Sequence, residues 1–152
     1  MKKLTAVLVL LLAGWTTGAA AANRAVVTSA IAPLLSAPGG TGAIRTDEAL
    51  YGMVVEVLNQ SNAQYPYVRT SYGFEGYARA QDLYVDDAVA AAWAGRFNYR
   101  VSFPHGDIAQ TASTGSGSYK VGTLPKGALL QVTATGSWGY TLSFPVPFVH
   151  TE

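Results

Sequence analysis

The sequence predicts an all-β protein of two small barrels that a short helix joins, with the second barrel incomplete. Two of the observations behind this are a repeat and its turns. A turn glycine followed by an alternating apolar strand occurs at Leu50–Val57 and again at Leu124–Val132. Short runs of β-branched and aromatic residues between glycine-containing turns are typical of strands. The third observation is the alanine-rich run at 88–94, which separates the two copies and favours a helix.

We expect four segments along the chain. Residues 1–22 are predicted to be an export signal, and residues 23–85 a first barrel. Residues 86–98 are predicted to be a helical linker, and residues 99–152 a second barrel that lacks its closing hairpin. With about 60 residues each, the two barrels are close to the lower size limit for independent folding.

The N-terminus has the three parts of a secretory signal. Lys2 and Lys3 precede an apolar run at 4–12, and small residues follow at 20–22. The run is shorter than the roughly 20 residues that span a bilayer. We therefore expect cleavage before Asn23 and a secreted or periplasmic product. Because no cysteine follows the signal, neither a lipid anchor nor membrane attachment is expected after cleavage.

Charge and cysteine content exclude several classes of function. Loss of Lys2 and Lys3 leaves 8 basic against 9 acidic residues, so no basic face for nucleic acid is expected. Charged residues make up only 12% of the chain, so serine, threonine, asparagine and tyrosine must supply much of the surface polarity. Such a surface suits sugars and peptides. The absence of cysteine excludes both a disulfide and a thiol nucleophile.

The first barrel is predicted from five short runs between turns. The predicted strands are at 25–30, 43–47, 53–59, 65–70 and 74–80. Turns are predicted at 38–42, 50–52, 60–63 and 71–73. Met53, Val55 and Val57 alternate, so they share one face of their strand and are predicted to lie in the core.

The linker contains the start and stop residues of a short helix. Asp86 and Asp87 are good N-caps for the run at 88–94, and Gly95 is placed to end it. Two turns of helix are too few to be stable alone. Trp93 is therefore predicted to anchor the helix against the barrels and not to contact a ligand.

The second barrel follows the same pattern for part of its length. Its predicted strands are at 99–103, 119–124, 128–135 and 138–143. Pro145 and Pro147 then interrupt, and a proline cannot donate a hydrogen bond to a sheet. The second barrel should therefore stay open, and its free edge could accept a strand from a protein partner.

Together these motifs resemble the bacterial SH3-like domain, a small barrel of exported cell-wall proteins. In the first copy, which extends over 26–83, the similar motifs are Leu50-Tyr51-Gly52, Val55-Glu56-Val57, Tyr65 to Val68 and Gly76-Tyr77-Ala78. In the second copy, at 101–142, they are Leu124-Pro125-Lys126-Gly127 and Trp138-Gly139-Tyr140-Thr141, without a glycine–aromatic hairpin.

The tandem resembles the N-terminal half of NlpC-type cell-wall cysteine peptidases, in particular the γ-D-glutamyl-diamino-acid endopeptidases. The resemblance implies that the SH3-like domains border a substrate cleft. It also implies that the nucleophilic cysteine and its histidines belong to a following catalytic domain, with which nothing in this chain aligns. The chain itself is therefore not expected to be an enzyme.

The residues themselves also offer little catalytic chemistry. His105 with Asp107 could supply a base and its orienting group, but no serine has the glycine spacing of a nucleophile elbow, so His105 is interpreted as a loop residue. Its distance from His150 and the lack of cysteine predict no metal site, and no cofactor is expected. Glu56 and Glu75 lie on different predicted strands, and spacing alone does not show that they converge.

Aromatic residues remain as the candidate binding groups. Tyrosine offers a flat apolar face with a polar tip, which suits peptide or sugar recognition. Alternation places Tyr65 and Tyr67 on one face, and Tyr72 in a turn is expected to be the most exposed. The candidate ligand-binding residues are Tyr65, Tyr67, Tyr72, Phe74, Tyr77, Trp138 and Tyr140.

These observations predict an exported, non-catalytic module that binds or positions cell-wall peptidoglycan or its stem peptides. One alternative is an N-terminal remnant of an NlpC-type cysteine endopeptidase that has lost its catalytic domain. Another is a structural adaptor whose open second barrel accepts a strand from a partner.

Overall fold

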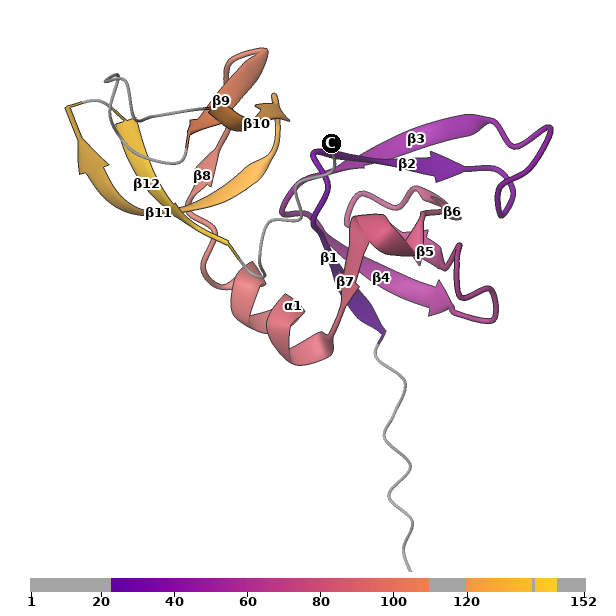
Figure 1. Cartoon of the computed structure of the whole chain (residues 1–152). Coiled ribbons are helices and arrows are strands. Elements are labelled where there is room, and N and C mark those ends of the chain that lie inside the picture. The colour runs from indigo at the N-terminus through magenta and orange to yellow at the C-terminus, as the bar shows by residue number, and fades with distance from the viewer. Residues whose placement is uncertain (1–22, 110–119, 138, 145–152) are drawn as a thin grey trace, which may run out of the picture.

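The computed structural model describes residues 23–109, 120–137 and 139–144 of the chain. Within these residues the strands form antiparallel sheets, and one α-helix links two groups of strands (Figure 1). The predicted all-β fold is therefore confirmed. No helix in the described ranges is long and apolar enough to cross a membrane.

The first unit is one curled antiparallel sheet that forms a half-barrel, with the order β3-β2-β6-β5-β4-β1-β7 (Figure 1). Its strands are β1 (Arg24–Val27), β2 (Ile31–Leu35), β3 (Arg45–Leu50), β4 (Val54–Asn59), β5 (Tyr67–Arg69), β6 (Glu75–Tyr77) and β7 (Leu83–Val85). Alternate residues point to the inside of the curl and form its core. The buried core residues are Ala25, Val27, Ala32, Leu34, Ala49, Val55, Val57, Val68, Ala78 and Leu83.

The prediction of five strands in this unit is wrong, because β2 and β7 were not foreseen. Pro33 lies in the middle of β2 and argues against a strand at the level of sequence. The backbone N–H of Tyr51 donates to the carbonyl of Ala30. Because hydrogen-bonded pairs alternate along an antiparallel ladder, the even-numbered residues of β2 are the ones that bond to β3. The nitrogen of Pro33 therefore points away from β3, to the side where β2 pairs with β6 only at Leu35.

The linker helix forms where the sequence predicts it, as α1 (Asp87–Ala94). The carboxylate of Asp86 accepts a hydrogen bond from the backbone N–H of Val89 at 2.9 Å, which is the contact of an N-cap. Gly95 caps the other end. The predicted start and stop residues are thus both confirmed.

Trp93 anchors this helix to the first unit, as expected. The side chain is 2% exposed and packs with Val26 and Ala90 on the outer face of the sheet. Its indole N–H donates a hydrogen bond of 2.7 Å to the backbone carbonyl of Gly52. The helix is therefore tied to the turn of the first repeat.

The second unit consists of two small sheets, one with the order β10-β9 and one with the order β12-β11-β8. Its strands are β8 (Tyr99–Arg100), β9 (His105–Ala109), β10 (Lys120–Pro125), β11 (Leu129–Gly136) and β12 (Gly139–Ser143). The interpretation of His105 as a loop residue is wrong, because it begins β9 and pairs with Pro125. In β9 only Ile108 is buried, so its strand structure depends on pairing with β10 more than on its own apolar pattern.

The repeated motif has the same backbone structure in both copies. Gly52 and Gly127 have positive φ angles of 78° and 99°, which glycine adopts at little cost. The N–H of Gly52 donates to Val27 at 2.9 Å, and the N–H of Gly127 donates to Val101 at 2.8 Å. Two further backbone hydrogen bonds are also equivalent in the two turns. In the first turn, the N–H of Tyr51 donates to Ala30 and that of Met53 donates to Leu50. In the second turn, the N–H of Lys126 donates to Pro104 and that of Ala128 donates to Pro125.

The two repeated turns also pack against each other. The N–H of Leu129 donates to the carbonyl of Tyr51 at 2.9 Å. Tyr51 is 2% exposed and belongs to the core of the second unit, with Ile108, Leu124 and Ala128. Its ring meets that of Phe144 edge-on, with centroids 5.9 Å apart. The two units are therefore joined through a residue of the first repeat.

Several sequence-based expectations lie outside the described residues. They are the signal at 1–22, Trp138, the prolines at 145 and 147 and His150. The absence of a closing hairpin in the second unit stays a prediction for the same reason.

Candidate ligand-binding surface

The outer face of the first sheet carries a set of polar and aromatic side chains. Val68 on β5 and Val55 on β4 point into the core, so their neighbours in sequence point outward. Three adjacent strands thereby place Glu56, Tyr67, Arg69, Glu75 and Tyr77 on one surface.

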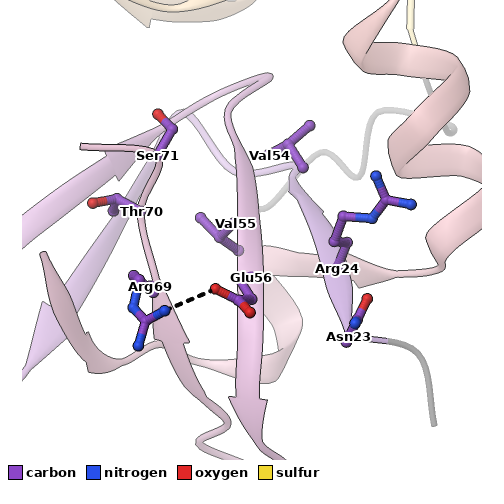
Figure 2. Close-up of a pocket in the computed structure, with 8 residues that line it drawn as sticks. All are labelled: Asn23, Arg24, Val54, Val55, Glu56, Arg69, Thr70 and Ser71. Atoms are coloured by element: carbon purple, nitrogen blue, oxygen red, sulfur yellow. Dashed lines mark hydrogen bonds and ion pairs between the residues drawn. The ribbon is translucent and has the colours of Figure 1, made fainter. Parts of the chain in front are cut away.

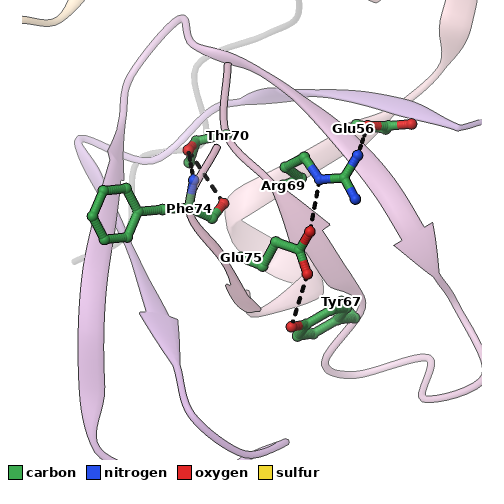
Figure 3. A network of polar contacts seen from close by, with 6 residues as sticks. All are labelled: Glu56, Tyr67, Arg69, Thr70, Phe74 and Glu75. Carbon is green, nitrogen blue, oxygen red and sulfur yellow. Dashed lines mark hydrogen bonds and ion pairs between the residues drawn. The ribbon is translucent and has the colours of Figure 1, made fainter. Parts of the chain in front are cut away.

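Arg69 is the centre of this surface (Figure 3). Its Nε lies 2.7 Å from Oε1 of Glu75, and its Nη1 lies 3.1 Å from Oε2 of Glu56. The hydroxyl of Tyr67 donates a hydrogen bond of 3.1 Å to the other oxygen of Glu75. We call these four residues, Glu56, Tyr67, Arg69 and Glu75, the outer-face network. The two glutamates, which spacing alone could not place, thus converge on one guanidinium.

The hydrogen bonds shift the ionisation of the network in opposite directions. The Arg69 hydrogen bond, followed by that of Tyr67, lowers the pKa of Glu75. The hydrogen bond to Glu75 raises the pKa of Arg69 and also that of Tyr67. At neutral pH the surface therefore presents an arginine cation, a neutral phenol and a Glu75 carboxylate that is a weak base.

The β5–β6 hairpin holds these residues in register. Thr70 Oγ1 accepts a hydrogen bond from the N–H of Phe74 at 3.0 Å and donates to its carbonyl at 3.2 Å (Figure 3). Gly73, with a φ of 94°, makes the predicted turn. The pairing of Arg69 with Glu75 follows directly from this hairpin.

Tyr67 and Tyr77 supply an aromatic surface beside the charges. They pair across β5 and β6, and their ring centroids are 4.8 Å apart at an interplanar angle of 54°. Both side chains are partly exposed. The two rings offer an apolar contact next to charged groups, a combination that suits a peptide.

A groove of about 520 Å³ borders the outer-face network (Figure 2). Glu56 projects between Arg69 on one side and Arg24 on the other, so charges of opposite sign alternate along it. Val54 lines the groove and also packs against the cluster that holds α1. The lining residues are Asn23, Arg24, Val54, Val55, Glu56, Arg69, Thr70 and Ser71.

The structure divides the predicted aromatic residues among separate places. Tyr67 and Tyr77 adjoin the network, whereas Tyr72 and Phe74 form a pair at the hairpin tip, with centroids 5.7 Å apart and exposures of 49% and 55%. The hydroxyl of Tyr72 donates to the carbonyl of Glu48 at 2.8 Å. Tyr72 is exposed, but the prediction that it is the most exposed of the candidates is wrong, because Phe74 is more exposed.

Tyr65 does not share a strand face with Tyr67, so that prediction is wrong. Tyr65 precedes β5, where Asn62 accepts a hydrogen bond from its N–H. Its ring lies so close to Gly39 that a β-carbon there would be 2.7 Å away. Tyr65 thus supports the 38–42 loop, and it also lines a second cavity of about 380 Å³ together with Arg79.

Tyr140 lies in the second unit, away from the other described candidates. It pairs with Tyr99, with ring centroids 5.5 Å apart, and it is 59% exposed. Trp138, the remaining candidate, lies outside the described residues.

Sequence analysis missed Arg69, although a sign of its role was present. Arg69 follows Tyr67 by two positions, so strand alternation places both on one face. Only the register of β5 with β6 shows that Glu75 lies opposite Arg69, and only the register of β4 with β5 shows that Glu56 lies on its other side.

Asp107, the residue that could have oriented His105 as a base, is engaged by two residues of β10. Asp107 lies 2.8 Å from Nζ of Lys120 and accepts a hydrogen bond from Thr123 at 3.2 Å. Both partners lie on the neighbouring strand β10, and the hydrogen bond from Lys120 lowers the pKa of Asp107. Within the described residues no three metal-binding side chains cluster.

Comparison with known proteins gives one informative match. No protein-family model matches the chain. The chain is 33% identical over 107 residues to a protein named Dipeptidyl-peptidase 6 from Lysinibacillus sphaericus. The matched region is 70% of this chain but 38% of that relative, so the chain spans well under half of the relative's length. The chain is thus similar to part of a bacterial peptidase, whereas the SH3-like tandem and the NlpC-type resemblance stay predictions.

Proposed function

We propose that the chain is an exported, non-catalytic module that binds or positions the peptides of cell-wall peptidoglycan. The observation that carries this proposal is the outer-face network, in which Arg69 and two glutamates lie beside a tyrosine pair and a groove. The similarity to part of a protein named as a peptidase agrees with a role at a peptide substrate.

The chemistry of the surface favours a peptide that carries both kinds of charge. Arg69 can bind a carboxylate, and Glu56 can accept an ammonium group in the same groove. The arginine and glutamate side chains are 44% and 49% exposed, so a ligand can reach both. Tyr67 and Tyr77 would cover the apolar part of such a peptide.

Binding can be tested with purified cell-wall sacculi. The full chain is expressed with export, and the exported protein is mixed with sacculi at low salt and sedimented. We expect the protein to sediment with the sacculi, and Arg69→Ala to weaken retention about tenfold, as for an interface arginine that bears much of the binding energy. Absence of the parent protein from the pellet would count against the proposal.

Arg45→Ala is the matched control for Arg69→Ala. Arg45 is also an exposed arginine, and it forms an ion pair of 2.8 Å with Glu48. It lies on β3, away from the groove. Retention should be unchanged in this variant, and equal weakening by both substitutions would indicate nonspecific charge attraction.

A second candidate function is favoured by the coverage of the relative. Because the matched region makes up 38% of a protein named as a peptidase, the chain could correspond to the substrate-positioning part of a cysteine endopeptidase. Reading the DNA beyond the codon for Glu152 in all three frames tests this. A segment that encodes a cysteine and later histidines would favour it, and a genome without one would leave the independent module as the better account.

A further inference from the structure

One backbone hydrogen bond extends the pairing of β1 and β4 to Asn23, the residue before β1. The backbone N–H of Val57 donates to the carbonyl of Asn23 at 2.6 Å, and the next pair in the register is Arg24 with Glu56. The sheet therefore positions the backbone of Asn23, the residue that directly follows the small-residue run at 20–22.

The backbone nitrogen of Asn23 lies beside a carboxylate. It donates to Oδ1 of Asp87 at 3.3 Å, and Arg24 Nε lies 3.6 Å from the same oxygen. Asp87 is in the first turn of α1, where the helix dipole favours a negative charge. Asn23 also lines the groove that borders the outer-face network (Figure 2).

We propose that maturation cuts the chain between Ala22 and Asn23, and that the new α-ammonium group of Asn23 forms an ion pair with Asp87 at the rim of the groove. This inference rests on the export that is part of the proposed function. Hydrolysis consumes one water, leaves a carboxylate on Ala22 and gives Asn23 an amino group. That amino group is mostly protonated at neutral pH, because free α-amino groups have a pKa of about 7.7–8.0.

The ionised neighbours explain how this charge is accommodated. Asp87 comes from α1 and Glu56 from β4, and they oppose the charges of the ammonium and of Arg24. Asp86 is engaged at the helix N-cap, and Arg69 lies across the groove beyond Glu56. An amide N–H at this place donates one hydrogen bond, whereas the ammonium adds a full charge that Asp87 can pair with.

The first test identifies the mature N-terminus. The 152-residue precursor is produced in a bacterium, and the exported protein is examined by N-terminal sequencing and intact mass. We expect a chain that begins at Asn23. A chain that begins elsewhere, or one that stays uncut, would overturn the proposal. This measurement does not involve sacculi, so its outcome is independent of whether the protein binds cell wall.

The second test detects the ion pair through the pH dependence of stability. The ion pair should raise the pKa of the α-amino group in the folded state, so its stabilisation is present below about pH 7.7 and is lost as the pH rises through the folded value. Asp87→Asn should therefore lower Tm more at about pH 6.5 than at about pH 9.5. Arg24 stays charged throughout this range and contributes no such dependence.

A control variant inserts Gly-Ser between Ala22 and Asn23, so that cleavage leaves the amino group two residues away from Asp87. In this background the effect of Asp87→Asn on Tm should be the same at both pH values. Equal pH dependence with and without the insertion would contradict the ion pair.

Discussion

The two copies of the repeated turn differ at the residue before the glycine, and this difference explains how the two units fit together. The first copy has Tyr51 and the second has Lys126 at the equivalent position. Tyr51 is buried in the core of the second unit, whereas Lys126 is exposed. The backbone hydrogen bonds of the two turns are otherwise the same. The two turns thus have the same backbone structure, but only the first supplies a side chain that joins the units.

The cores of the units differ in the same way. The buried core inside the first sheet comes from residues of the first unit alone. The described core of the second unit includes Tyr51 and is lined in part by Ala30, both from the first unit. We therefore expect the first unit to depend on the second less than the second depends on the first.

The largest effect is expected for Gly52→Ala, which disturbs the contact between the turns. The residue has a φ of 78°, and a β-carbon would lie 2.3 Å from the carbonyl oxygen of Leu129. We expect a loss of about 4 kcal/mol in unfolding free energy, measured by urea denaturation. Gly40→Ala is the control, because its φ is 85° but nothing lies within 4 Å of its β-carbon. Gly40→Ala should lower the unfolding free energy by about 1–2 kcal/mol. Equal losses in the two variants would show that the contact between Gly52 and Leu129 adds nothing to stability.

Tyr51→Ala should have an effect of similar size and should distinguish the two units. Removal of a buried aromatic side chain costs about 3–5 kcal/mol. Hydrogen exchange should accelerate more in the β9–β10 ladder than in the β1–β4 ladder. Tyr84 is an exposed residue of β7, so Tyr84→Ala should leave the exchange rates of both ladders unchanged. Uniform acceleration in both ladders would mean that the molecule unfolds only as a whole.

Trp93→Phe should have a smaller effect on stability, through the hydrogen bond that ties α1 to the first turn. The substitution keeps an aromatic ring but removes the N–H that donates to the carbonyl of Gly52. We expect a loss of about 1–3 kcal/mol, since the buried carbonyl loses its donor. Thermal unfolding monitored by circular dichroism provides the measurement. A Tm equal to that of the parent would show that this hydrogen bond adds nothing to the attachment of α1.

The smallest effect appears only in alkaline solution. Burial raises the pKa of the Tyr51 phenol, so this group favours the folded state below its unfolded pKa of about 10, and the contribution is lost as the pH rises above that value. Unfolding free energy should therefore fall above about pH 10, and the fall should be shallower in Tyr51→Phe. Identical slopes for the two proteins between about pH 9 and pH 11 would contradict this.

Much of the local structure was predictable because short-range chemistry decides it. Asp86 and Gly95 bound the helix as expected, and Gly73 makes the expected hairpin turn. By contrast, β2 was missed because it contains Pro33. Proline is tolerated there because its nitrogen points away from β3, which only the strand register shows. Likewise β9 was missed because its strand structure depends on β10.

The candidate site was predictable only in part. Alternation and composition identified Tyr67 and Tyr77 as candidates, and the structure places them together. The same reasoning wrongly grouped Tyr65 with Tyr67, because it assumed that the strand began two residues earlier than it does. Arg69 was overlooked because its two glutamate partners come from β4 and β6, and pairing between strands is not visible along the chain.

The sequence by itself determined the all-β fold, the repeated glycine turns and the short capped helix. These features depend on φ preference, alternation and capping, which act over a few neighbouring residues. Only the tertiary structure decided that Tyr51 completes the other unit's core and that Glu56 and Glu75 meet at Arg69. Both outcomes depend on strand register and on the contact between units, which bring together residues that are distant in the chain.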